Sequence, residues 1–149
     1  MITRSNIIDS IINHLKSNFT WNGETVHYTR SVGAIDLLPT MQFSYDGAMD
    51  FNKQSQIKQD YIITTPIQIR FFCDYSGGDD TQILENGANE IIKKLSQTIG
   101  IDELTRISNN DVEWLTIESI LISNDIKETE KTGRSELLID LLIRFYSEY

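Results

Sequence analysis

The fold of this chain is decided by one strand-like stretch, YIITTPIQIRFFCD, at positions 61–74. Its odd positions form a nearly continuous apolar face, and its even positions include the polar residues Thr64, Gln68 and Arg70. This period of two predicts a β-strand that buries one face. Pro66 has no N–H for a ladder hydrogen bond, so we expect a bend, a bulge or a sheet edge near it.

Four further segments have the β-branched and aromatic composition of strands. In order along the chain they are residues 25–30, 37–45, 112–122 and 136–146. In the second of them, alternation after Pro39 places apolar side chains on one face. Pro39 itself should begin that strand or lie on a sheet edge, because it cannot donate to a ladder. The residues on that face are Met41, Phe43 and Tyr45.

The N-terminal segment, residues 5–19, has the apolar spacing of an amphipathic helix. We expect Ser5 or Asn6 to cap it by accepting a hydrogen bond from an unpaired backbone N–H group. Its buried stripe is predicted to consist of Ile7, Ile8, Ile11, Ile12, Leu15 and Phe19.

A second amphipathic helix is predicted over residues 80–99, with Asp79 or Asp80 as its N-cap and Gly100 as its end. Gly87 lies inside it. A glycine there weakens a helix by roughly 1 kcal/mol, unless it marks close packing against the sheet. The predicted buried stripe consists of Ile83, Leu84, Ala88, Ile91, Ile92, Leu95 and Ile99.

These elements predict a single α+β domain over residues 1–149, a length that suits one hydrophobic core. We expect a mostly antiparallel β-sheet of about five strands packed against two main helices, in the order α-β-β-β-α-β-β.

The last predicted strand is apolar on both faces. Leu138 and Leu142 alternate with the main apolar face and share their own face with Asp140 and Arg144. We expect this second face to be covered by a helix or by another subunit. Leu138, Asp140 and Leu142 are therefore candidate interface residues.

Two long polar connections are further candidates for contacts outside the domain. Residues 46–60 join the second and third strands, and connections longer than about 12 residues are uncommon unless they are functional or disordered. Two interpretations stay open: an ordinary hairpin connection, or an arm that contacts a neighbouring subunit or lines a pore. Residues 124–135 form the second connection, a charged loop. The candidate interface residues in the two connections are Met49, Phe51, Ile57, Lys58, Lys127, Glu128 and Glu130.

The chain is acidic, with 13 basic and 22 acidic side chains and a net charge of −9. The outer surface of nucleic acid and anionic membranes both attract clustered Lys and Arg, so we expect neither as a partner. A negatively charged channel through which DNA passes without binding stays compatible with this charge. No stretch reaches the roughly 18 apolar residues of a membrane span, and the N-terminus has no apolar signal core.

Residues with reactive side chains are scattered. Cys73 is the single cysteine, so no internal disulfide forms, and we interpret it as a small buried hydrophobe in a reducing environment. His14 and His27 lie apart from any cluster at ligand spacing, so no metal site is expected. A Ser–His–Asp arrangement stays open, because triads are defined by geometry, but no nucleophile motif is present.

Gly77-Gly78 precedes a helix as a phosphate-binding loop would, but no lysine follows at the required spacing. Asp79 and Asp80 follow instead, and their charge repels phosphate. We interpret these aspartates as helix caps, and the pair Glu128 and Glu130 as solvated loop charges. We predict no catalytic, cofactor-binding or metal-binding residue, no cofactor and no enzymatic activity.

The pattern of elements resembles the tail terminator, or tail completion, proteins of long-tailed bacteriophages. Those small proteins begin with an amphipathic helix and have an early strand with a proline, here 37–39. A long strand, here 67–72, leads to a second helix, here 83–99. A strand pair ends the chain, here with residues 137–146.

The resemblance implies a structural virion protein that assembles as a hexameric ring at the head–tail junction. Such a ring caps the tail tube, stops its polymerisation, and joins it to the head or neck after assembly in the host cytoplasm. The implied partners are further copies of the chain, the tail tube protein and a head-completion or neck protein, with DNA passing through the channel and no membrane involved. Three alternatives stay open: another neck or tail component of similar fold, a small acidic adaptor or inhibitor that binds one protein, and a small enzyme.

Overall fold

The computed structural model describes residues 3–21, 23–30, 37–45, 47–75, 80–100, 112–127 and 132–149. Within these residues the chain forms two helices and one six-stranded sheet. The helices are α1 (Arg4–Asn18) and α2 (Asp80–Gly100). The strands are β1 (His27–Thr29), β2 (Thr40–Tyr45), β3 (Asp50–Lys53), β4 (Asp60–Tyr75), β5 (Val112–Lys127) and β6 (Thr132–Glu148).

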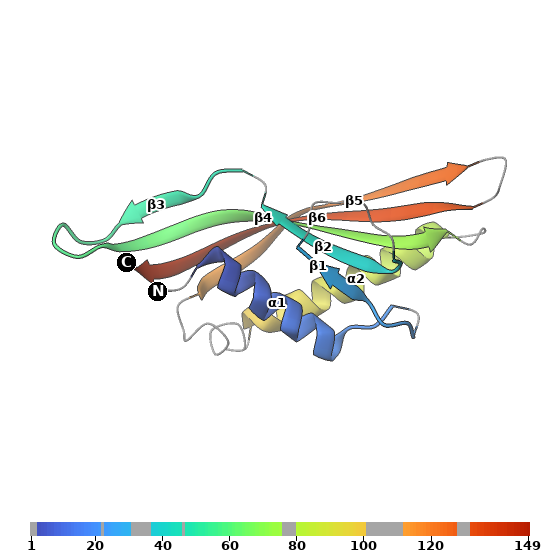
Figure 1. Ribbon diagram of the computed structural model, residues 1–149, viewed down its shortest axis with the longest axis horizontal. Coiled ribbons are helices and arrows are strands. Elements are labelled where there is room, and N and C mark those ends of the chain that lie inside the picture. The colour runs from blue at the N-terminus through green and yellow to red at the C-terminus, as the bar shows by residue number, and fades with distance from the viewer. Residues whose placement is uncertain are drawn as a thin grey trace.

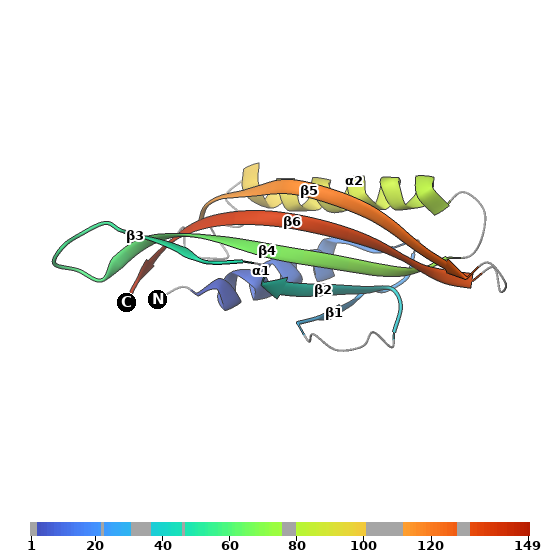
Figure 2. The same cartoon turned by 90° about the horizontal axis from the view of Figure 1, so that it is seen from above.

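The sheet forms one layer and both helices form the other (Figure 1). Seen from above, α2 runs along β5, and α1 lies on the side of β4 and β2 (Figure 2). The predicted α+β class is therefore confirmed, and the order of elements differs from the expected one only by the additional strand β3.

The strands pair in the order β1-β2-β4-β6-β5, with β3 also paired to β4. All pairs are antiparallel except β1 with β2, which is parallel. Strand β4 is central, because β6 pairs with its whole length on one side while β2 and β3 share the other side. The sequence stretch that predicted the fold is thus the strand around which the sheet is built.

Pro66 lies where β4 changes its partner strand. The pairing with β2 ends at Tyr45↔Ile67, and the pairing with β3 begins at Asp50↔Thr64. A residue without an N–H group is tolerated in such a gap. The irregularity expected near Pro66 is therefore present, as a change of the neighbouring strand from β3 to β2.

Strand β5 contains two register shifts relative to β6, at Glu113 and at Glu118. An extra residue in a strand reverses which face the following side chains occupy. Before the second shift, the odd-numbered Leu115 is buried on the helix side. Beyond that shift the even-numbered Ile120 and Ile122 face the same side and pack against the core. The bulges keep the apolar side chains of a long strand on the helix side.

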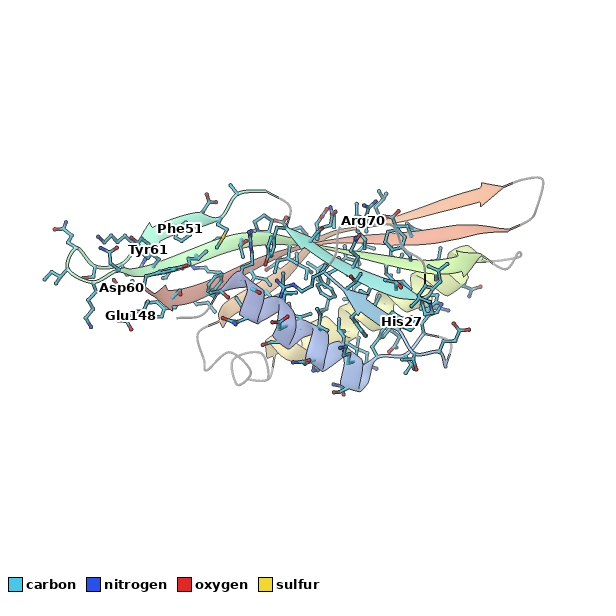
Figure 3. The ribbon with its side chains drawn as sticks, viewed as in Figure 1. His27, Phe51, Asp60, Tyr61, Arg70 and Glu148 are labelled. Carbon is cyan, nitrogen blue, oxygen red and sulfur yellow. The ribbon has the colours of Figure 1, made fainter. Side chains whose placement is uncertain are left out.

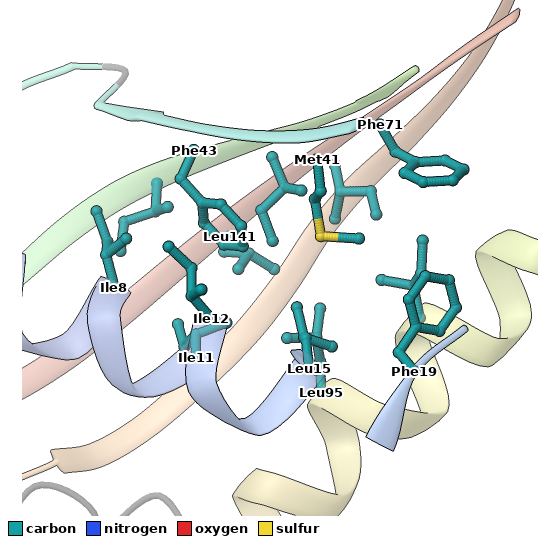
Figure 4. Packing of buried hydrophobic residues seen from close by; sticks show 14 of the residues in the cluster. Ile8, Ile11, Ile12, Leu15, Phe19, Met41, Phe43, Phe71, Leu95 and Leu141 are labelled. Atoms are coloured by element: carbon teal, nitrogen blue, oxygen red, sulfur yellow. The ribbon is translucent and has the colours of Figure 1, made fainter. Parts of the chain in front are cut away.

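The core lies between the helices and the sheet (Figure 4). Ile8, Ile11 and Leu15 of α1 face Phe43 and Leu141 of the sheet, and all five side chains are buried. Burying one such side chain contributes ~1.5–3 kcal/mol to folding. The predicted apolar stripe of α1 is buried throughout, as are Leu84, Ala88, Ile91 and Leu95 of the α2 stripe, whereas Ile92 is only partly buried.

The predicted cap of α1 is wrong. Thr3 is the N-cap: its hydroxyl accepts a hydrogen bond from the Asn6 N–H at 3.2 Å, and the Asn6 side-chain oxygen accepts one from the Thr3 N–H at 3.0 Å. This reciprocal capping box places Ser5 and Asn6 inside the first turn. In α2, Asp80 is the first helical residue, and Asp79 lies outside the described residues.

The two predicted connections are shorter than expected. Residues 46–60 contain β3, which continues the edge of the sheet where β2 stops. Residues 124–135 are not one loop, because β5 continues to Lys127 and β6 begins at Thr132, paired in register. Backbone pairing to a long neighbouring strand overrides the weak strand propensity of polar residues.

Gly87 is the site at which Trp21 packs onto α2. A Cβ atom at Gly87 would lie 1.8 Å from Cζ3 of Trp21. The Trp21 ring in turn contacts the Phe71 ring edge-on, with centroids 4.9 Å apart. The close packing at this glycine is therefore against an indole ring from the segment that follows α1 rather than against the sheet.

Gly87→Ala should destabilise the fold by about 1–3 kcal/mol, because the added methyl group overlaps Trp21 and the core must shift. At an ordinary helix position the same change would stabilise by about 1 kcal/mol. Urea unfolding monitored by circular dichroism measures the difference. In a Trp21→Leu background, which removes the ring, Gly87→Ala should cost nothing. An equal loss in both backgrounds would contradict the packing explanation.

Candidate functional site

The sheet has one open face, opposite the helices, formed by the even-numbered residues of β4 and β6. Among the described residues no helix covers this face. Of the two expected covers, a helix is therefore not found in the described part of the chain, and another subunit stays a prediction. Leu138 and Leu142 are partly exposed on it, with Asp140 between them. On the neighbouring β5, Leu121 is opposite Leu138 and is 59% exposed. The structure thus brings the three predicted residues of β6 together in one row.

Polar groups on the open face are paired within the chain. Nε of Arg70 lies 2.6 Å from a carboxylate oxygen of Glu136. Asp140 accepts hydrogen bonds from Gln68 at 3.2 Å and from the Ser119 hydroxyl at 2.9 Å. Because these groups already have partners, no second protein is needed to pair the charges of Arg70, Glu136 and Asp140.

Residues 49–61 form an arm that extends from one end of the sheet (Figure 1). It consists of β3, the turn after it and the start of β4, and the C-terminal end of β6 lies alongside. Two backbone bonds tie it together, from the Gln54 N–H to the Asp60 carbonyl oxygen and from the Tyr149 N–H to that of Gln59. The protruding arm that was one of our two interpretations of 46–60 is therefore present, while its role in contacts stays a prediction.

Aromatic side chains line the arm (Figure 3). The rings of Phe51 and Tyr61 meet edge-on with centroids 5.6 Å apart, and Tyr61 meets Tyr149 at 5.9 Å. Phe51 is 52% exposed, and Ile57 at the turn is 93% exposed. The arm therefore presents an apolar surface to solvent.

The predicted residues of the arm divide into two groups. Phe51, Ile57 and Lys58 are exposed. Met49 is partly buried and packs against the core, so it supports the base of the arm rather than its surface. Sequence reasoning missed Lys53, Tyr61 and Tyr149 as neighbours of these residues. Only the pairing of β3, β4 and β6 brings them together, and no local sequence signal indicates that register.

A buried carboxylate, that of Asp60, lies at the turn end of the arm, next to the Lys53↔Tyr61 pair. One oxygen of Asp60 accepts a hydrogen bond from the Tyr146 hydroxyl at 3.4 Å, and the other has no partner among the described residues. Burying a half-satisfied carboxylate costs free energy. The turn end of the arm is therefore held by backbone pairing and apolar packing rather than by this side chain.

The described ends of the second predicted connection, residues 124–127 and 132–135, lie at the opposite end of the molecule from the arm (Figure 1). Lys127 is the last residue of β5 and pairs with Thr132. Glu128 and Glu130 lie outside the described residues, as does the Gly77-Gly78 turn. The described parts of the two predicted connections therefore do not form a joint surface within one chain.

The described residues contain no group of three or more His, Cys, Asp or Glu side chains placed to hold a metal ion. His14 is on α1 and His27 on β1, and Cys73 is buried on β4. Among the described helices, none is long and apolar enough to cross a membrane. A scan against protein-family models finds no matching family, and no curated protein matches the sequence.

Burial raises the pKa of the Tyr28 hydroxyl from 10.0 to about 12. This hydroxyl is buried and has no hydrogen-bond partner among the described residues. The folded state therefore retains the proton of Tyr28 above the pH at which the unfolded chain loses it.

Tyr28→Phe should be as stable as the wild type at pH 8 or more stable by about 1 kcal/mol, because it removes a desolvated hydroxyl. The pKa of Tyr28 is higher in the folded than in the unfolded chain. Its titration therefore leaves the free energy of unfolding of the wild type unchanged below pH 10.0 and lowers it as the pH rises towards about 12. Tyr28→Phe has no hydroxyl to titrate and should not show this alkaline decrease in the free energy of unfolding. Urea unfolding at several pH values between 8 and 12 measures it, with the exposed Tyr149→Phe as the control. An alkaline loss in Tyr28→Phe equal to that of the wild type would contradict the assignment.

Proposed function

We propose that this chain is a structural ring protein that caps the tail tube of a long-tailed phage and joins it to the head or neck. The observation that carries the proposal is the architecture: a single sheet with both described helices on one face, one open face, and an arm at one end. Such a subunit has surfaces available for neighbours on several sides, as a ring requires.

Two further observations support a structural role. The charges of the open face are paired internally, which suits a surface packed against protein rather than a site for a charged substrate. The net charge of −9 suits a ring through which DNA passes, because an acidic lumen repels phosphate and does not retain the duplex. The ring, its stoichiometry of six and its place in the virion follow from the resemblance.

The wild-type chain should form a concentration-dependent hexamer, or should form rings only on tail tube protein. Size-exclusion chromatography with light scattering measures the first outcome. Electron microscopy of tube assembly measures the second: added chain should shorten the tubes, because a capped end cannot grow. An unrelated protein of similar size and acidity is the control.

Tubes of unchanged length, together with a chain that remains monomeric and does not sediment with tube, would contradict the proposed function. Stable binding of the monomer to one host protein would favour the adaptor instead.

A further inference from the structure

The end of the arm differs in charge from the rest of the chain. The arm tip, defined as residues 51–59, contains Lys53 and Lys58 and no acidic residue. The whole chain has a net charge of −9, and removing these two lysines leaves −11 for the remainder. Both lysines are exposed, and no carboxylate among the described residues lies within ion-pair distance of either. The arm tip thus presents two exposed, unpaired lysines on an acidic protein, in a stretch bounded by Asp50 and Asp60.

The arm tip also carries an apolar anchor. The Ile57 side chain, next to Lys58, is 93% exposed, so solvent surrounds almost all of it. Phe51 adds a second half-exposed apolar surface. Apolar side chains rimmed by charge are typical of protein contact sites, where the apolar groups supply affinity and the charges supply selectivity.

The outer edge of β5, on the other side of the sheet from the arm, carries acidic and apolar side chains that complement the arm tip. Strand β5 ends the sheet order, so within the described residues no strand pairs with its outer edge. Glu113 and Glu118 occupy its two register shifts, and Leu121 is 59% exposed. Charges and bulges on an edge strand prevent pairing with an identical edge, since like charges would meet. Of the two, Glu118 is exposed and can attract a lysine, whereas Glu113 already pairs with Arg144.

We infer that the arm tip of one copy docks on the β5 edge of a second copy. The lysines of the tip meet Glu118 of the edge, and Ile57 packs near Leu121. A second copy is the favoured occupant because both complementary surfaces belong to this one chain, and because the remaining charge of −11 repels anionic lipid and nucleic acid.

This contact joins two different surfaces and therefore repeats head to tail. The arm lies on the β2 side of β4, and β5 lies beyond β6 on the other side. A head-to-tail contact produces a ring when its rotation closes. The inference rests on the self-association part of the proposed function and specifies the surfaces that carry it.

Charge reversal tests the contact directly. Lys53→Glu with Lys58→Glu makes the arm tip acidic, and Glu118→Lys makes the edge basic. Glu113 is left unchanged because it pairs with Arg144 at 2.7 Å. Each variant alone should need at least tenfold more protein for half-assembly in sedimentation velocity, since like charges then meet. Ile57→Ser should weaken assembly without any change of charge.

A one-to-one mixture of the two charge variants supplies the decisive measurement. In the mixture an acidic tip meets a basic edge, and a native tip meets a native edge, so alternating assemblies should form at the wild-type concentration. Lys16→Glu with Lys93→Glu, and Glu24→Lys, make matched charge changes on exposed residues elsewhere and should assemble normally. Circular dichroism melting confirms that each variant folds.

The outcomes separate this inference from the proposed function. Two results would overturn the docking contact without contradicting the proposed ring. In the first, both charge variants assemble as well as the wild type; in the second, the mixture of the two variants does not recover assembly. A wild type that never associates, alone or on tube, would overturn both. Sedimentation of the monomer with phosphatidylserine vesicles, abolished by Lys53→Glu with Lys58→Glu, would assign the arm tip to a membrane surface and overturn the contact.

Discussion

The antiparallel pairing of β4 with β6 is the interaction on which the rest of the structure depends. It is continuous from Asp60↔Glu148 to Tyr75↔Gly133. In this register, apolar residues oppose apolar residues on the helix side, as in Ile63↔Phe145. A slip of one residue would turn every one of these side chains to solvent, so the core fixes the register. The helices have a buried surface to cover only because this pairing is in place.

The length of that pairing also explains the arm. A strand of 16 residues, such as β4, spans about 50 Å, whereas the 15 residues of α1 span about 22 Å. Helix α1, which lies on the side of β4, therefore cannot cover the whole length of that strand. Where β4 extends past α1, its residues pack instead against β3 and the C-terminal end of β6, through Phe51, Tyr61 and Tyr149. The exposed aromatic side chains follow from strands longer than the helices beside them.

Periodicity carried most of the fold prediction. The alternation in β4 and β6 and the apolar stripes of both helices are strong local signals, and most of the residues that they indicate are buried in the described part of the chain, although Tyr61 and Ile92 are only partly buried. Strand β3 was missed because its four residues, Asp50–Lys53, are all exposed and lack alternation. It forms because β2 ends at Tyr45 and leaves the edge of β4 open. A tertiary cause of this kind has no local sequence signature.

The packing of Trp21 against Gly87 could not be predicted from the sequence for a related reason. A glycine inside a helix indicates either a weak point or a close contact, and only the fold decides which ring approaches it. The candidate site divides in the same way. Individual exposed residues of the arm, such as Phe51 and Ile57, were predictable from isolated apolar residues in a polar run. Their grouping with Tyr149 depends on strand register, which the sequence does not encode locally.

The distribution of charge distinguishes the two candidate surfaces from each other. On the open face, Arg70 and Asp140 already have partners within the chain, so contact with another protein there would depend on shape and on the leucines of β6. On the arm tip, Lys53 and Lys58 have no acidic partner among the described residues. Exposed charges that are unpaired gain more from a complementary partner than charges that must first break an existing pair. An arm that must select one neighbour in a fixed orientation therefore fits the basic tip better than the open face, which suits broad packing without strong selectivity.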